Sequence, residues 1–379
     1  MEKRKLGKTG IETSILGFGA MRLPTLAWDK EDINHDEAIR IMRKAFDSGV
    51  NHVDTAYNYH DEESEIVVSK ALKDGYREKV TLSTKCPVWH DDFSEPEHFD
   101  KYLDESLKKL DVEYLDIYFL HSINQKRWEE KVKPFKLIER AKKAKEDGRI
   151  KFIGFSFHDK PEVLKEIIDS DGFDVMLVQY NILDVANEAM IKYAAEKGLG
   201  VFIMGPVGGG RLAGNPPDDL QPLLTKGREN FTDLALKFVW SNPNISVALS
   251  GMSNEEMVDD NIAIATSKEV TLTRDELVKA KKIETKFKEL TDLICTSCNY
   301  CMPCPNEVNI SFIFRSIIQA QVYGQMERGK LYYSKIGEKE WPPGERADAC
   351  IECGECEPKC PQKIPIIDQL KKAHELLKT

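Results

Sequence analysis

The stretch DEAIRIMRKAFDSGVNHVDTA, residues 36–56, contains the pattern that decides the fold. Its first part places Ala38, Met42 and Phe46 on one face of a predicted helix. Gly49 then supplies the left-handed conformation that closes a helix, and the apolar run NHVDTA follows. We therefore interpret the stretch as a helix followed by a buried strand.

This unit recurs along the first ~270 residues, where a short apolar run follows each helical pattern. The eight runs are SILGFG (14–19), NHVDTA (51–56), VTLSTK (80–85), YLDIYFLH (114–121), KFIGFS (151–156), VMLVQY (175–180), GVFIM (200–204) and ISVALSG (245–251). Runs that are apolar on both faces are typical of parallel strands covered by helices. They predict an α/β fold, a closed (β/α)8 barrel of the TIM type. A doubly wound open sheet is the alternative, but no GxGxxG follows an early strand.

Length and composition suggest two domains in one globular chain. The 379 residues exceed one typical domain, and we expect a barrel domain over 1–285 and a smaller domain over 286–379.

A net charge of −10 argues against nucleic acid or an anionic membrane as the main partner. Without an apolar run typical of a signal peptide or a membrane span, a cytoplasmic protein is expected. Its nine cysteines are then not expected to form a disulfide framework.

Polar residues stand where several of the predicted strands end. Asp54 belongs to HVDTA and Tyr59 comes five residues later, while Lys85 ends VTLSTK and His121 ends YLDIYFLH. Catalytic groups of such barrels lie at this end of the strands. Because the three strands are consecutive, we expect the four side chains to converge.

Together these groups can form a device for proton transfer. An isolated tyrosine titrates near ~10 and is a poor acid at neutral pH. An ammonium close to Tyr59 favours the phenolate, and Asp54 would hold Lys85 charged and oriented. With His121 fixing the approach of a carbonyl, the tyrosine can protonate the carbonyl oxygen as hydride reaches the carbon. Each residue alone would be an ordinary structural residue, but the set favours catalysis.

The DTAxxY motif, the lysine after the third strand and the histidine after the fourth resemble the aldo-keto reductase family over roughly residues 3–270. The resemblance implies a (β/α)8 barrel that binds NADP or NAD without a Rossmann fold. It also implies reversible conversion of a small aldehyde or ketone to an alcohol. Carried over, Tyr59 is the general acid–base, Lys85 and Asp54 tune it, and His121 orients the carbonyl.

The same resemblance implies a set of cofactor contacts. They are Gly19, Ala20 and Met21 near the nicotinamide, Ser156 and Gln179 at the carboxamide, Met204, Gly205, Pro206, Val207 and Gly210 from the end of the seventh strand into the pyrophosphate loop, and Gly251, Met252, Met257, Asp260 and Asn261 at the adenosine end. Met204 replaces the aromatic residue that usually stacks on the nicotinamide in this family. Phe157 replaces an asparagine that commonly follows the serine at position 156. Met257 stands where many members have an arginine for the 2′-phosphate, so NAD and NADP both stay open.

Other residues near the expected mouth have less specific interpretations. His60, His90 and His158 lie in predicted loops, where solvated side chains are the default expectation and contact with the substrate is the alternative. Trp89 fits a pocket wall and a core anchor equally well. Cys86 is expected to be a small buried residue.

The remaining eight cysteines form two dense runs after a predicted helix that starts at Thr273. They are Cys295, Cys298, Cys301 and Cys304 in C-x2-C-x2-C-x2-C-P, and Cys350, Cys353, Cys356 and Cys360 in C-x2-C-x2-C-x3-C-P. The second spacing resembles bacterial two-cluster [4Fe–4S] ferredoxins, which implies two clusters. In that resemblance the fourth cysteine of each run binds the other cluster. Structural zinc is the alternative, although it prefers two separated C-x2-C pairs.

Helical apolar spacing in VNISFIFRSIIQAQVYGQME (308–327) favours an α-helical ferredoxin-like domain. Its clusters could be structural, relay electrons to a redox partner protein or sense redox state. Hydride carries two electrons and a cluster moves one, which makes direct transfer between them awkward. We predict a carbonyl reductase fused to this domain. The alternative is a redox-sensing or electron-transfer subunit that binds nicotinamide with little carbonyl turnover.

Overall fold

The computed structural model of the protein describes residues 1–26, 32–214, 220–224, 230–290, 293, 295, 298–337 and 342–378. The chain divides into two compact units. The first comprises Met1–Pro206 and Leu236–Leu272, and the second comprises Val207–Ala235 and Thr273–Thr379. The domain boundary at residue 285 stays a prediction. Among the described helices, none is both long and apolar enough to cross a bilayer.

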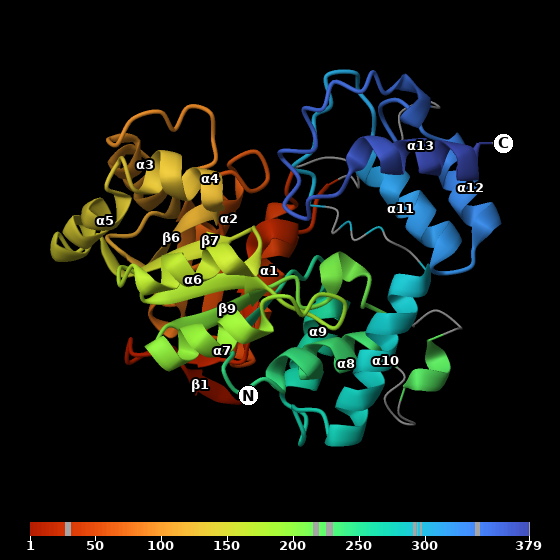
Figure 1. Cartoon of the computed structure of the whole chain (residues 1–379). Helices are drawn as coiled ribbons and strands as arrows, with labels where there is room; N and C mark the ends of the chain where they lie inside the picture. Colours follow the sequence, from red (N-terminus) through yellow and green to blue (C-terminus); the bar gives the residue numbers. More distant parts are fainter. Residues whose placement is uncertain are drawn as a thin grey trace. The chain divides into compact units, whose positions relative to one another are not determined.

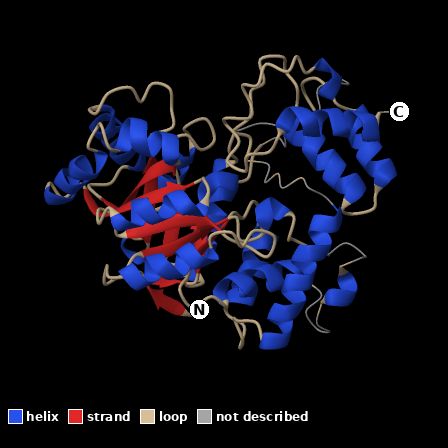
Figure 2. Ribbon diagram, in the orientation of Figure 1, coloured by secondary structure: helices blue, strands red, loops and turns tan. Residues whose placement is uncertain are grey.

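The first unit contains a closed barrel of eight parallel strands, as predicted (Figure 2). The strands are β3 (Leu16–Gly19), β4 (His52–Asp54), β5 (Thr81–Cys86), β6 (Leu115–Ile123), β7 (Ile150–Phe157), β8 (Val175–Gln179), β9 (Gly200–Met204) and β10 (Val247–Ser250). Each lies within or overlaps one of the eight apolar runs. β10 pairs with β3 and closes the cylinder.

Helices follow most of the strands and cover the barrel (Figure 1). They are α1 (His35–Asp47), α2 (Ser64–Ala71), α3 (His98–Leu110), α4 (Gln125–Arg127), α5 (Leu137–Glu146), α6 (Pro161–Asp169), α7 (Glu188–Lys197) and α9 (Glu255–Ala265), with the short helices η1 (Ala20–Arg22), η2 (Arg77–Lys79) and η3 (Trp128–Val132). α8 (Phe231–Trp240) begins in the second unit and ends in the first. The side chain of Asn34 accepts the backbone N–H of Glu37 and begins α1. The helix buries Ala38, Met42 and Phe46, the face that the sequence predicts.

An antiparallel hairpin, which the apolar pattern did not predict, precedes the barrel. It joins β1 (Lys3–Lys5) to β2 (Glu12–Ser14). Between these strands Leu6 is fully buried in one cluster with Val175 and Val247, the first residues of β8 and β10. Leu6 therefore fills the amino end of the barrel, and the opposite end is left for the polar residues.

The second unit is mainly helical, as expected for the ferredoxin-like domain. Its other elements are η4 (Gly208–Gly210), η5 (Gln221–Leu223), α10 (Arg274–Leu290), α11 (Ile310–Gln321), α12 (Met326–Ser334), η6 (Ala347–Ala349) and α13 (Ile366–Leu377). α11, α12 and α13 pack against one another (Figure 1), and Ile313, Ile317 and Leu370 are buried on them. The sequence predicts that this helix runs on into Cys295, but α10 ends at Leu290 and the described Leu293 and Cys295 are not helical. Residues 291, 292 and 294 lie outside the described residues.

Candidate functional site

Four polar side chains meet at the carboxyl end of the neighbouring strands β4, β5 and β6. Asp54 is the last residue of β4, Lys85 is the last but one of β5, and His121 lies near the end of β6. Tyr59 belongs to the turn that follows β4. These strands are paired in parallel, so their ends are adjacent. The structure thus brings together the four residues that the sequence singled out.

A buried ion pair lies at the centre of this group. Nζ of Lys85 is 2.6 Å from Oδ2 of Asp54, and the same Nζ donates a hydrogen bond to the carbonyl oxygen of Thr55, also at 2.6 Å. Lys85 is 1% exposed and Asp54 is 3% exposed. The Lys85 ammonium lies 4.7 Å from the centroid of the Tyr59 ring. Asp54 and the carbonyl of Thr55 therefore hold the buried Lys85 ammonium beside the ring of Tyr59.

Burial is the main influence on the protonation of this pair. It raises the pKa of Asp54, an effect that the charge and hydrogen bond of Lys85 oppose. It lowers the pKa of Lys85, and the charge of Asp54 opposes this shift in turn. Each residue therefore depends on the other to remain charged in the barrel.

His121 is held as a neutral imidazole. Burial, with smaller contributions from the charges of Lys85, His158 and Arg127, lowers its pKa well below the ordinary value. Its ring lies edge-on to Tyr59, with the ring centroids 6.1 Å apart. The indole nitrogen Nε1 of Trp89 donates to Nδ1 of His121 at 3.4 Å. A neutral imidazole can offer one N–H to a substrate oxygen at any ordinary pH.

Two residues behind the ion pair were not identified from the sequence. Ser83 donates from Oγ to Oδ1 of Asp54 at 2.7 Å, and Nε2 of His52 lies 3.1 Å from that Oγ. Burial lowers the pKa of His52 to about 3, so it is neutral. His52 and Ser83 precede Asp54 and Lys85 by two residues on the same strands. Because side chains two apart share a strand face, this alternation could have identified them.

His60 differs from its expected place in a solvated loop. It is 8% exposed, and its Nε2 accepts the backbone N–H of Leu23 at 3.2 Å. His60, Asp61 and Glu62 all have positive φ, a tight turn that sequence spacing does not indicate. The turn therefore ties the residue after Tyr59 to the end of η1. The expectation was wrong for His60 because this turn folds the imidazole inward.

The residues expected near the nicotinamide come from several strand ends. Gly19 ends β3, Ala20 and Met21 belong to η1, Ser156 is the last but one residue of β7, Gln179 ends β8 and Met204 ends β9. Gly205 and Pro206 follow Met204 directly. Oγ of Ser156 accepts the backbone N–H of Ser122 at 2.7 Å. These positions are consistent with a cofactor along the carboxyl end of the barrel, and their roles stay predictions.

The side chain of Gln179 contains a buried donor atom. Its Nε2 is buried and has no hydrogen-bond partner among the described residues. A Cβ atom on Gly205 would come within 2.7 Å of the Gln179 Oε1 atom, so only glycine leaves room there. A buried donor without an acceptor costs about 1–3 kcal/mol. An amide oxygen of a bound cofactor would satisfy this donor, so the residues fit a nicotinamide carboxamide.

The expected adenosine contacts lie at the end of β10 and on α9. They are Gly251, Met252, Met257, Asp260 and Asn261. Asn261 is buried and donates from Nδ2 to Oγ of Ser250 at 2.8 Å, while Met257 is 42% exposed. Val207 and Gly210 of the expected pyrophosphate loop belong to the second unit. Their contact with a cofactor stays a prediction.

Cysteine thiols gather in two neighbourhoods within the second unit. Burial is the main cause that raises the pKa of Cys301, and the charges of Cys298, Cys295 and Cys360 raise it further. Burial likewise raises the pKa of Cys356 to about 11, with smaller contributions that include the charges of Cys350 and Cys304. Thiols from both runs therefore meet in each neighbourhood, and Cys86 belongs to neither.

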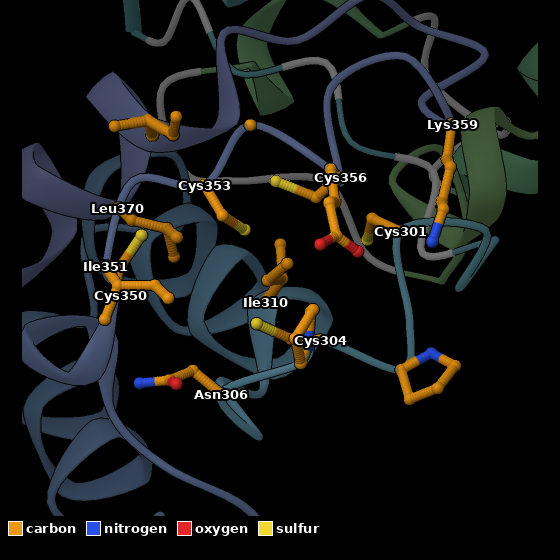
Figure 3. Close-up of a pocket in the computed structure, with 15 residues that line it drawn as sticks. Cys301, Cys304, Asn306, Ile310, Cys350, Ile351, Cys353, Cys356, Lys359 and Leu370 are labelled. Carbon is orange, nitrogen blue, oxygen red and sulfur yellow. The ribbon is translucent and has the colours of Figure 1, made fainter.

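A cavity adjoins the second neighbourhood (Figure 3). Cys304, Cys350, Cys353 and Cys356 lie around it, and Cys301 contributes to its lining. Ile310, Ile367 and Leu370 supply apolar walls. Among the described residues, no three His, Cys, Asp or Glu side chains are arranged to hold a single metal ion. A donor set made only of thiols, from runs with this spacing, fits iron–sulfur clusters.

The chain resembles proteins of known families over most of its length. Residues 15–284 match the model of the aldo/keto reductase family, and residues 294–364 match the model of a 4Fe-4S dicluster domain. L-galactose dehydrogenase from Arabidopsis thaliana is 29% identical over 77% of this chain and 97% of its own length. NADH-specific methylglyoxal reductase from Escherichia coli is 27% identical over 69% of this chain and 93% of its own length.

Solved structures agree with these matches. The holo form of an aldo-keto reductase from Bacillus halodurans superposes with a TM-score of 0.65 at 27% identity. The match covers 75% of this chain and 96% of that protein. This chain therefore belongs to the aldo/keto reductase family, as an NAD(P)-dependent oxidoreductase that also contains a 4Fe-4S dicluster domain.

Proposed function

We propose that the protein reduces a small aldehyde or ketone with NAD(P)H, and oxidises the alcohol in reverse, with Tyr59 as general acid–base. The observation that supports this most strongly is the buried Lys85–Asp54 pair beside the Tyr59 ring. An ammonium next to a phenol favours the phenolate and so makes the hydroxyl a better acid. Asp54 keeps that ammonium charged in a place where burial alone would neutralise it.

The reaction divides between the cofactor and the chain's own residues. A bound nicotinamide supplies the hydride. Tyr59 gives its hydroxyl proton to the carbonyl oxygen, and Lys85 stabilises the phenolate that results. His121 donates an N–H to the same oxygen and sets the direction from which the carbonyl approaches Tyr59. Gln179 would hold the cofactor carboxamide through its buried Nε2 atom.

The eight clustered cysteines fit two [4Fe–4S] clusters. We propose that Cys295, Cys298, Cys301 and Cys360 hold one cluster, and that Cys304, Cys350, Cys353 and Cys356 hold the other. The two neighbourhoods of thiols support this partition. The clusters then act as structural cross-links of the helical unit or as one-electron relays to a partner protein.

The adenosine end favours NADH over NADPH. Met257 offers no positive charge for a 2′-phosphate, and the first turn of α9 contains Glu255 and Glu256. Lys44 and Arg40 are already bound to Glu255, and Lys44 is also bound to Asp259. We expect kcat/KM to be at least about tenfold higher with NADH, because an unpaired phosphate near carboxylates is repelled. Met257→Arg should raise kcat/KM for NADPH and leave that for NADH nearly unchanged. Equal or better use of NADPH by the wild type would contradict this assignment.

Tyr59→Phe tests the catalytic proposal directly. The change removes one hydroxyl and keeps the ring, so carbonyl reduction should fall by about 10²–10⁴-fold while nicotinamide binding persists. Stopped-flow absorbance measures the first turnover, and fluorescence titration measures cofactor affinity. Tyr57→Phe is the matched control, because the Tyr57 hydroxyl bonds to Glu105 at 2.7 Å and is not part of the proposed machinery. Full activity of Tyr59→Phe would overturn the role of Tyr59, whereas little carbonyl turnover by the wild type would favour the redox-subunit alternative.

Metal analysis tests the cluster proposal. Anaerobically purified protein should contain about eight iron and eight acid-labile sulfide per chain and absorb broadly near ~400 nm. Cys353→Ser should lose about half of the iron, because one of its cluster's ligands is replaced. Cys86→Ser should keep all of it, since Cys86 is buried in the barrel. A colourless protein that contains zinc would contradict the assignment.

A further inference from the structure

The segment after β5 holds Trp89 in a short, hydrogen-bonded turn. The backbone N–H of Val88 donates to the carbonyl of Cys86 at 2.8 Å, and that of His90 donates to the carbonyl of Pro87 at 2.9 Å. Trp89 lies between these bonds, at the end of the strand that contains Lys85. Its indole is therefore presented from a constrained backbone.

Lys131 restrains this turn through two hydrogen bonds. It comes from η3, and its Nζ donates to the carbonyl oxygens of Val88 at 2.9 Å and of His90 at 3.0 Å. One ammonium thus binds the residue on each side of Trp89. Hydrogen bonds from a charged donor are stronger than neutral ones, so this contact restrains the loop that contains the indole.

The indole N–H restricts the tautomer of His121. An indole N–H is a donor and has no acceptor, so Nδ1 of His121 must present its lone pair to Trp89 at 3.4 Å. The proton of the neutral ring then lies on Nε2. In the opposite tautomer two N–H groups would face each other. The bond is long, but catalytic hydrogen bonds often shorten when the substrate is bound.

We propose that Trp89 is a positioning residue that fixes the His121 tautomer with its proton on Nε2, facing the substrate carbonyl, and that Lys131 holds Trp89 in place for this purpose. The inference rests on the proposed carbonyl reduction. It assigns Trp89 a polar role, in place of the pocket wall or core anchor that its sequence position suggests. The direction of the His121 pKa agrees, since a neutral ring has one N–H and its place can be selected.

Nitrogen NMR tests the tautomer without using activity. In protein labelled with ¹⁵N-histidine, with the His121 signals assigned by their loss in His121→Asn, the wild type should show a protonated Nε2 and an unprotonated Nδ1. Trp89→Phe keeps an aromatic ring and removes the N–H, so a mixture of tautomers is expected. Trp128→Phe is the matched control, because the indole Nε1 of Trp128 also donates a hydrogen bond, to Glu166 at 2.9 Å instead of to a histidine.

The rate of carbonyl reduction should change together with the tautomer of His121. Trp89→Phe should lower kcat for carbonyl reduction by roughly threefold to tenfold, the effect of one lost hydrogen bond, with cofactor affinity unchanged. Lys131→Met should shift the tautomer in the same direction, whereas Lys131→Arg, which keeps a donor, should restore it.

A protonated Nδ1 in the wild type, or an unchanged tautomer in Trp89→Phe, would overturn the role of Trp89. An unchanged tautomer in Lys131→Met would overturn the role of Lys131. The NMR result stands even if Tyr59→Phe proves active, so the two proposals fail separately.

Discussion

The ion pair between Lys85 and Asp54 is the interaction on which the candidate active site depends. Two charges removed from water are costly, and their attraction offsets that cost only when the geometry is good and other hydrogen bonds complete them. Here the carbonyl of Thr55 and the hydroxyl of Ser83 complete the pair. Removing one partner would leave an unpaired buried charge, a change that typically costs about 3–5 kcal/mol. The barrel supports the pair by placing the ends of β4 and β5 side by side.

Burial of the ion pair also determines how Lys85 acts on Tyr59. Desolvation pushes both members of the pair towards neutrality, so Lys85 remains charged because of Asp54 rather than because of water. Its ammonium therefore acts on Tyr59 with little screening by solvent. Two of the groups around this centre are neutral imidazoles: His52 behind Asp54, and His121 beside the phenol. The arrangement holds one positive charge beside the ring of Tyr59.

Much of the fold followed from periodicity, because apolar runs buried on both faces leave few alternatives to a covered parallel sheet. Asp54, Lys85 and His121 could be found because strand ends converge in a barrel. The cysteines could be found because their spacing is itself the signal. Ser83 and His52 were missed because their importance depends on which strand face points inward. His60 and Lys131 were missed because long-range backbone contacts, which leave no sequence pattern, determine their positions.

The most direct measurement of the central claim is the pH dependence of the first turnover of carbonyl reduction in the wild type and in Asp54→Asn. Reduction needs the protonated acid and the charged Lys85, so the rate should fall as the pH rises through the apparent pKa of the coupled groups. Asp54 raises the pKa of Lys85 against the effect of burial, and its loss therefore lowers that pKa further. The account predicts that the fall in Asp54→Asn begins at lower pH than in the wild type. A fall that stays in place or moves to higher pH would contradict it.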